Sequence, residues 1–242
     1  MMNFSESNQI PLAPEQCVTG FGTTLIVAPH ADDESLGCAG LIALLRKYGQ
    51  AVHIFLLSDG TLSHPNSKEY PAEKLRDLRE QELKDAASVL GVESGNIIYC
   101  RYGDRNVPDE DADDFETAVE SISKQLELIK PQSMFVPWRR DPHPDHRAAY
   151  QLMSAANTLG AKVFEYPIWL QELGESVDFP DDGEVVPFRL DISSVLQLKK
   201  AAISMHRSQY ADLITDDEHC FRLSREMIEQ LSKNFEIFYM SN

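Results

Sequence analysis

Short apolar stretches alternate along this chain with longer segments in which apolar residues recur every three or four positions. The first pattern is typical of buried strands and the second of amphipathic helices. The predicted strands cover residues 23–28, 52–57, 96–100, 133–136 and 162–166. The predicted helices cover residues 36–48, 72–90, 115–129 and 146–159. Strands that alternate with helices pair in parallel through right-handed crossovers, so we expect a three-layer α/β fold with helices on both faces of a mostly parallel sheet.

The pattern changes in the last third of the chain. Residues 174–187 are acidic and rich in turn-forming residues, and helical spacing returns around residues 195–207 and 224–231. A final apolar run at 235–240 predicts a closing strand that can pair antiparallel. No internal stretch has the composition of a linker, and no repeat is visible. We therefore expect one domain over residues 1–242, with residues 1–20 as an N-terminal extension and 174–187 as a variable loop.

Composition narrows the class of partner. Hydrophobic residues make up 43% of the chain, which is enough for a core, and the formal net charge is −17 with a sequence pI of about 4.7. Nucleic-acid binding depends on clustered Lys and Arg that neutralise phosphates, so this charge argues against it and against anionic membranes. We expect a small-molecule substrate and no nucleic-acid or membrane partner, and the sequence leaves homo-oligomerisation open.

The N-terminal segment and the cysteines bear on the compartment. Residues 1–15 contain neither a basic segment nor an apolar run, and no apolar stretch is long enough to span a bilayer. The four cysteines, at positions 17, 38, 100 and 220, are far apart and form no Cys-x-x-Cys pair. Both features predict a cytoplasmic protein with reduced thiols. A metal ion, if one is bound, must then be held by histidines and carboxylates.

The first candidate for chemistry directly follows the strand at 23–28. It reads His30-Ala31-Asp32-Asp33-Glu34 and leads into the next helix. Zinc is commonly bound by imidazole nitrogen and carboxylate oxygen, so a histidine and carboxylates on one tight turn suit a zinc site. Acidic residues at a helix start are also selected by N-capping and by the helix dipole, and this segment alone does not separate the two interpretations.

The second candidate, from Asp141 through His143 and Asp145 to His146, follows the strand at 133–136 and also enters a helix. Two histidines with interleaved aspartates in a proline-containing loop are typical of a metal site rather than of a core. In open α/β sheets ligands bind beyond the carboxyl ends of the strands, so both segments should lie on the same rim. The remaining histidines have no such context, and we interpret them as structural: His53, His64, His206 and His219.

With both segments considered, the sequence resembles the PIG-L/LmbE-like family of zinc-dependent N-deacetylases. The first segment looks like the family's Pro-His-Pro-Asp-Asp-Glu motif and the second like its His-Pro-Asp-His motif. Arg79 and Glu82 are similar to the family's Arg-x-x-Glu helix, and Ser208-Gln209 resembles its late Ser-Gln element. Ala31 stands where the family has a proline, so we expect a less rigid loop with the chemistry retained.

The resemblance implies an LmbE-like, Rossmann-like version of the fold with one Zn²⁺ per chain, although other divalent ions suit the same ligand types. The implied metal ligands are His30, Asp33 and His146. The implied catalytic residues are Asp32 as general base and His143, oriented by Asp145, near the developing oxyanion. The implied substrate contacts are Arg79 and Asp104.

The activity implied by the resemblance is hydrolysis of an N-acyl group, in the simplest case N-acetyl, from an acylated amino sugar or sugar conjugate such as an N-acetylglucosamine derivative. Two alternatives remain. Asp-x-His-x-Asp-His differs at Asp141 from the His-x-His-x-Asp-His run of two-metal, metallo-β-lactamase-like hydrolases. A non-catalytic sugar- or nucleotide-binding module would use residues 37–40 as a glycine-rich turn. Residues 174–187, with Trp138 and Trp169, are candidates for the pocket lining, but the sequence does not identify the substrate.

Overall fold

The computed structural model describes residues 9–241, and the eight strands in that part of the chain form a single sheet. The order across the sheet is β1-β7-β8-β6-β5-β2-β3-β4. The strands are β1 (Leu12–Ala13), β2 (Thr24–Ala28), β3 (Val52–Ser58), β4 (Ile97–Tyr102), β5 (Ser133–Pro137), β6 (Lys162–Tyr166), β7 (Val185–Asp191) and β8 (Phe235–Ser241). Strands β2 to β6 are parallel to their neighbours among themselves, and β8 is antiparallel to both β6 and β7. The expected mostly parallel sheet and the antiparallel closing strand are confirmed.

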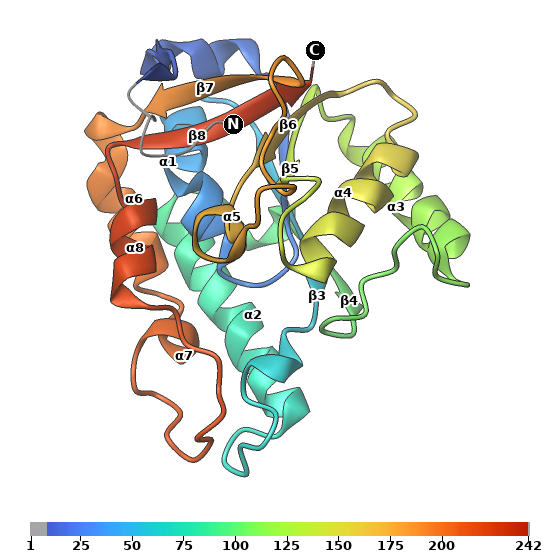
Figure 1. Ribbon diagram of the computed structural model, residues 1–242, viewed down its shortest axis with the longest axis vertical. Helices are drawn as coiled ribbons and strands as arrows, with labels where there is room; N and C mark the ends of the chain where they lie inside the picture. Colours follow the sequence, from blue (N-terminus) through green and yellow to red (C-terminus); the bar gives the residue numbers. More distant parts are fainter. Residues whose placement is uncertain (1–8, 242) are drawn as a thin grey trace.

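Helices cover both faces of this sheet, as Figure 1 shows. On one side lie α1 (Asp33–Lys47), α2 (Ala72–Val89), α6 (Leu196–Ile203) and α8 (Arg225–Leu231). On the other lie α3 (Phe115–Ile129) and α4 (Pro144–Ala156). The shorter helices are α5 (Leu170–Leu173) and α7 (Arg207–Tyr210), with single turns η2 (Glu15–Gly20), η3 (Thr61–Ser63), η4 (Ser94–Asn96) and η5 (Ser193–Val195). A separate apolar cluster fills each interface between sheet and helices, which confirms the three-layer α/β architecture.

The order of the strands fixes where a ligand can bind. After β2 the chain forms β3 and β4, which follow one another on one side of β2 in the sheet. The chain then crosses over the sheet, and β5 pairs with the other edge of β2. The chain therefore leaves the carboxyl ends of β2 and β5 toward opposite faces of the sheet, so a crevice opens between them. The two histidine-containing segments are the loops that leave these two strands.

A buried ion pair anchors α1, the helix that begins at the first of these loops. Lys199 and Glu236 are almost fully buried and bond to each other at 2.7 Å. Lys199 donates to the carbonyl oxygen of Leu36 at 2.8 Å, and Glu236 accepts from the backbone nitrogens of Gly40 and Leu41 at 2.7 and 2.8 Å. The backbone of α1 is thereby tied to α6 and to β8 across the core. These contacts hold α1 against the core from residue 36 onward.

Four regions differ from the expected elements. The acidic stretch at 174–187 already contains the first residues of β7, which pairs with β8 along its whole length. Part of the expected N-terminal extension belongs to the fold, because β1 pairs in parallel with β7; residues 1–8 lie outside the described part. The helix expected at 195–207 divides into η5, α6 and α7. Finally, α1 starts three positions earlier than expected, so Asp33 and Glu34 lie in its first turn.

All four cysteines are free thiols, as expected, and Cys38 is buried within α1. Among residues 9–241 there is no helix both long enough and apolar enough to cross a bilayer.

Candidate metal and active site

An open pocket lies where the loops after β2 and β5 meet, which is the place where ligands bind in open α/β sheets. The loop after β4 and the segments around α5 and residue 221 complete its wall. The lining residues are His30, Asp32, Asp33, Leu36, Leu62, Ser63, Arg79, Asp104, Arg105, His143, Trp169, Leu173, Gln209 and Phe221. The expected convergence of the two segments on one rim is therefore present in the structure.

At the base of this pocket one carboxylate oxygen faces two imidazoles. Oδ2 of Asp33 lies 3.3 Å from Nδ1 of His30 and 3.2 Å from Nε2 of His146. The three side chains are buried or nearly so. In a tetrahedral zinc site with bonds of about 2.0–2.1 Å, neighbouring ligand atoms lie roughly 3.3 Å apart. The spacing from Oδ2 of Asp33 to each ring nitrogen fits a divalent metal ion.

Two further carboxylates face the outer nitrogens of the same imidazoles. Oδ2 of Asp145 lies 3.0 Å from Nε2 of His30, and Oδ1 of Asp141 lies 3.2 Å from Nδ1 of His146. Metal-binding histidines commonly direct their second nitrogen at a carboxylate, which fixes the tautomer and the ring orientation. Asp141 is itself held by the backbone nitrogens of His143, Ile168 and Trp169. Both imidazoles are thus oriented from behind.

The local electrostatics favour positive charge at this point. Burial lowers the pKa of His146, but Asp33 and Asp141 outweigh burial and raise that pKa to about 9. Burial opposes protonation of His30 in the same way, yet contacts with Asp104, Asp145 and Asp33 hold its pKa well above the usual value. Possible ligand atoms lie within 4.8 Å of one another in two overlapping groups, His30 with His143 and His146, and His30 with Asp104 and Asp145. Asp33, which contacts His30 and His146 individually, belongs to neither group. A cation placed here would be surrounded by carboxylates on several sides.

Asp32 lies beside this cluster, but its side chain takes a different direction from that of Asp33. Its backbone φ of 148° is one that residues other than glycine rarely adopt, and it places the Asp32 side chain in the pocket while Asp33 turns toward the histidines. Burial raises the pKa of Asp32 to about 6, with Arg79 opposing and Asp33 adding to the increase. A carboxylate with a pKa close to neutral pH is suited to accept and return a proton.

The two expected substrate contacts also lie in the pocket. Arg79 is buried, donates to the carbonyl oxygens of Gly60 and Ala31 at 2.9 and 3.0 Å, and approaches Oδ2 of Asp32 at 3.5 Å. Arg79 therefore braces the loop that carries Asp32 as well as facing the pocket. Asp104 lies 3.4 Å from His30 through one oxygen and accepts the backbone N–H of Leu62 at 2.8 Å through the other.

His143 packs edge-on against the ring of His30, with 4.7 Å between the ring centroids. Burial, followed by the positive charges on His146 and His30, lowers the pKa of His143 to about 4, so the ring is neutral near pH 7. Its Nδ1 accepts the backbone N–H of Asp145 at 3.2 Å, which leaves Nε2 as the protonated nitrogen. The contact between the two residues thus runs through the backbone of Asp145, whose carboxylate faces His30 instead.

Sequence reasoning missed some of these residues and misplaced another. It treated Asp141 only as the mismatch to a two-metal motif, although its place at the start of the Asp-Pro-His-Pro-Asp-His run was an available signal. Trp169 lines the pocket as expected, whereas Trp138 is fully buried in a separate cluster with Leu170, Val185 and Tyr239. The lining residues around Trp169 come from α5 and residue 221 rather than from 174–187. Nothing local in the sequence marks Phe221.

A doubly wound α/β sheet with histidines and carboxylates gathered at its switch point defines an α/β protein with a candidate metal site. More specifically, the chain belongs to the PIG-L family, because residues 25–157 match the family described as GlcNAc-PI de-N-acetylase. It is an N-deacetylase of that family.

Named relatives agree with this assignment. A probable N-acetyl-alpha-D-glucosaminyl L-malate deacetylase 2 from Bacillus subtilis is 29% identical over 216 residues, covering 87% of this chain and 89% of the relative. A diacetylchitobiose deacetylase from Thermococcus kodakarensis is 27% identical over 197 residues, covering 78% of this chain and 70% of the relative. The solved N,N'-diacetylchitobiose deacetylase from Pyrococcus horikoshii shares the fold, with a TM-score of 0.63, 22% identity, and coverage of 88% of this chain and 82% of that one.

The structure also bears on the two alternatives. In a two-metal hydrolase position 141 would supply a ligand, but Asp141 accepts backbone N–H groups and faces the outer nitrogen of His146. Gly37 and Gly40 lie inside α1, where an added Cβ would meet the ring of Tyr166 at 2.4 Å and the side chain of Ile192 at 2.5 Å. These glycines permit close packing of the helix and do not form a phosphate-binding turn.

Proposed function

We propose that the protein removes the N-acetyl group from an amino-sugar conjugate, with a single Zn²⁺ held by His30, Asp33 and His146. The observation that carries this proposal is the spacing of 3.3 and 3.2 Å from Oδ2 of Asp33 to the two imidazoles. A zinc ion there would supply a Lewis acid for the amide carbonyl and for the attacking water. The outer carboxylates of Asp145 and Asp141 keep the two rings in the orientation that binding needs.

The remaining steps belong to side chains of the pocket. Asp32 takes a proton from the attacking water as the new C–O bond forms, and it passes a proton to the nitrogen as the C–N bond breaks. The products are acetate and the protonated amine, which together carry all the atoms and protons of the amide and the water. His143 donates a hydrogen bond from Nε2 to the oxygen that gains negative charge, and because its ring is neutral this stabilisation does not require an imidazolium.

The shape of the pocket supports a conjugate rather than a free sugar. Its base is polar, with Asp104 and Arg79 placed to meet sugar hydroxyls. Its mouth carries apolar side chains from three separate segments: Leu62, Trp169, Leu173 and Phe221. Leu62 and Leu173 remain 46% and 59% exposed, and Trp169 and Phe221 pack edge to face at 5.5 Å. Exposed apolar side chains grouped at a pocket commonly contact ligand, so we infer a substituent with apolar surface next to the sugar.

The test of this function is release of free amine from a panel of N-acetylated sugars. The panel compares N-acetylglucosamine, N,N'-diacetylchitobiose, and N-acetylglucosaminides with anionic or apolar aglycones. We expect turnover of N-acetylglucosaminides, with the highest kcat/KM for an apolar aglycone. Leu173→Ser should remove that preference, whereas Leu128→Ser, at a 78% exposed position on α3, should leave it unchanged. Absence of amine release from every N-acetylated sugar by the metal-loaded protein would contradict the proposal.

The carboxylate behind His146 gives a separate prediction. We expect Asp141→Asn to weaken zinc affinity about 10–100-fold, because the carboxylate that orients His146 is lost. The measurement is competition for zinc against a chelator of known affinity. Glu165→Gln is the matched control, since Glu165 is an equally buried acid at the end of β6 that pairs with Arg139. Equal zinc affinity in wild type and Asp141→Asn would contradict the orienting role.

We also propose that the chain acts as one domain on a small-molecule substrate. The support is that the strands described between residues 9 and 241 all lie in one sheet, with the pocket at its centre.

A further inference from the structure

A buried carboxylate lies directly behind Asp32 and takes no part in the chemistry described above. Glu34, in the first turn of α1, is 0% exposed. Its Oε2 accepts the backbone N–H of Asp32 at 3.1 Å, so its side chain reaches back to the loop before the helix. A buried carboxylate is costly unless other groups pair with it and hydrogen-bond to it, so its second oxygen also requires partners.

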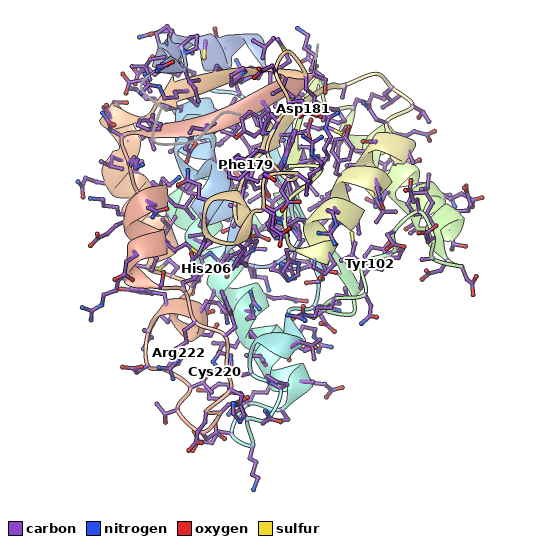
Figure 2. All side chains as sticks on the ribbon, in the orientation of Figure 1. Tyr102, Phe179, Asp181, His206, Cys220 and Arg222 are labelled. Atoms are coloured by element: carbon purple, nitrogen blue, oxygen red, sulfur yellow. The ribbon has the colours of Figure 1, made fainter. Side chains whose placement is uncertain are left out.

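Those partners come from the adjacent residue and from the distant C-terminal part of the chain. Oε1 of Glu34 accepts the hydroxyl hydrogen of Ser35 at 2.5 Å and faces Nε2 of His206 at 2.9 Å. His206 is buried, lies 172 positions away in sequence, and sits at the junction of α6 and α7 (Figure 2). Burial lowers the pKa of His206, but the carboxylates of Glu34, Asp32 and Glu82 together raise it above its usual value. Glu34 and His206 therefore form an attractive buried pair.

The backbone that this pair contacts is strained. Asp32 has φ 148° and ψ −28°, a sparsely populated conformation that persists only where the surrounding structure enforces it. The carbonyl oxygen of Asp32 accepts the N–H groups of Ser35 and Leu36 at 3.0 and 2.9 Å, as at an ordinary helix start. The N–H of Asp32 points the other way, and Glu34 is its acceptor. Glu34 thus holds the N–H of the peptide that precedes the Asp32 side chain, and Arg79 holds the carbonyl oxygen of the same peptide at Ala31.

The geometry points to Glu34 and His206 as a positioning pair that holds Asp32 in the strained conformation needed to place its carboxylate at the reacting centre. Neither residue lies in the pocket wall, so neither touches substrate. The inference rests on the proposed function in one respect, namely that Asp32 is the base. It adds a residue of the C-terminal segment, His206, to the determinants of turnover.

The chain supplies a control on the same helix. Lys199 and Glu236 form a second buried ion pair that also contacts the backbone of α1, but at Leu36 and at residues 40–41 and not at the loop before the helix. Lys199→Met should lower Tm while the folded, metal-loaded protein keeps its kcat. A general loss of stability at α1 can therefore be separated from a loss of positioning at Asp32.

The test compares two substitutions of His206 by amide side chains of different length. The amide nitrogen of His206→Gln falls near Nε2 of the imidazole and can still donate to Glu34. In His206→Asn it falls near Nδ1, which has no hydrogen-bond partner among the described residues. We expect His206→Asn to lower kcat about 10²-fold, as a small misplacement of a catalytic group does. KM should stay within about two-fold and metal content should not change, because only transition-state stabilisation is lost. His206→Gln should retain most of the turnover.

Hydrogen exchange at the Asp32 amide gives a readout that does not depend on activity. We expect faster exchange in metal-loaded His206→Asn than in wild type, in His206→Gln or in Lys199→Met.

The pairing is refuted by unchanged exchange and wild-type kcat in His206→Asn, or by an equal loss of kcat in Lys199→Met. Loss of metal in His206→Asn would show that the pair supports the metal site rather than Asp32. If the wild type hydrolyses no N-acetylated sugar, the proposed function fails, and the exchange experiment still tests the pair.

Discussion

His146→Ala should abolish both metal binding and amide hydrolysis. The wild type is expected to hold one zinc ion per chain, and removal of the ion with a chelator should lower the rate at least about 10³-fold, since a Lewis acid at the carbonyl contributes several kcal/mol. Added zinc should restore the wild type and fail to restore the variant. Elemental analysis and amine release are the measurements.

His219→Ala is the control for this experiment, because His219 is exposed in the C-terminal loop and does not line the pocket. It should keep both the ion and the activity. Two outcomes would contradict the ligand assignment: full metal occupancy in a His30→Ala, His146→Ala double variant, or two ions per chain in the wild type. The second outcome would favour the two-metal alternative.

The second large effect is expected at Asp32. Asp32→Asn preserves size and removes the proton acceptor, so turnover should fall about 10²–10⁴-fold with metal content unchanged. Asparagine is the suitable replacement because, with aspartate, it tolerates positive φ better than most residues, and φ at this position is 148°. The measurements are steady-state kcat and zinc content on the same preparation.

The neighbouring residue provides the matched comparison. Asp33→Asn should lose the ion, because Oδ2 of Asp33 is the atom that faces both imidazoles. Adjacent aspartates are thus expected to give opposite results in the metal assay. Near wild-type turnover in Asp32→Asn would disprove its role as base, and loss of metal in that variant would mean that the two roles are exchanged.

The fold was largely predictable because its elements have strong local signals. Strands β2, β3 and β5 are apolar runs that are almost completely buried, and the main helices carry apolar residues at helical spacing. Strand β7 was missed for the opposite reason. Its first residues follow a turn-rich acidic stretch, it contains Pro187, and its strand conformation is fixed by pairing with β8, which lies more than forty positions later in the chain.

Residue types on short segments determined which side chains are available for chemistry. The sequence alone placed His30, Asp32 and Asp33 on one turn and His143 and His146 on another, each directly after a strand. The rule that ligands bind at the carboxyl ends of strands then predicted a common rim. These inferences needed only contacts that are local in sequence or imposed by the fold class.

Only the tertiary structure decided which partner each side chain faces. Asp145 contacts His30 and not His143 through its carboxylate, and Asp141 stands behind His146. Glu34 is paired with His206, which the sequence suggested was merely structural. The physical reason is that such contacts depend on the exact position of the backbone. That position is set by long-range packing, namely by the packing of α1 against α6 and β8 and by the crossing of the chain from β4 to β5. Sequence fixes which groups exist on a loop, whereas the packed fold determines the distances that give them their roles.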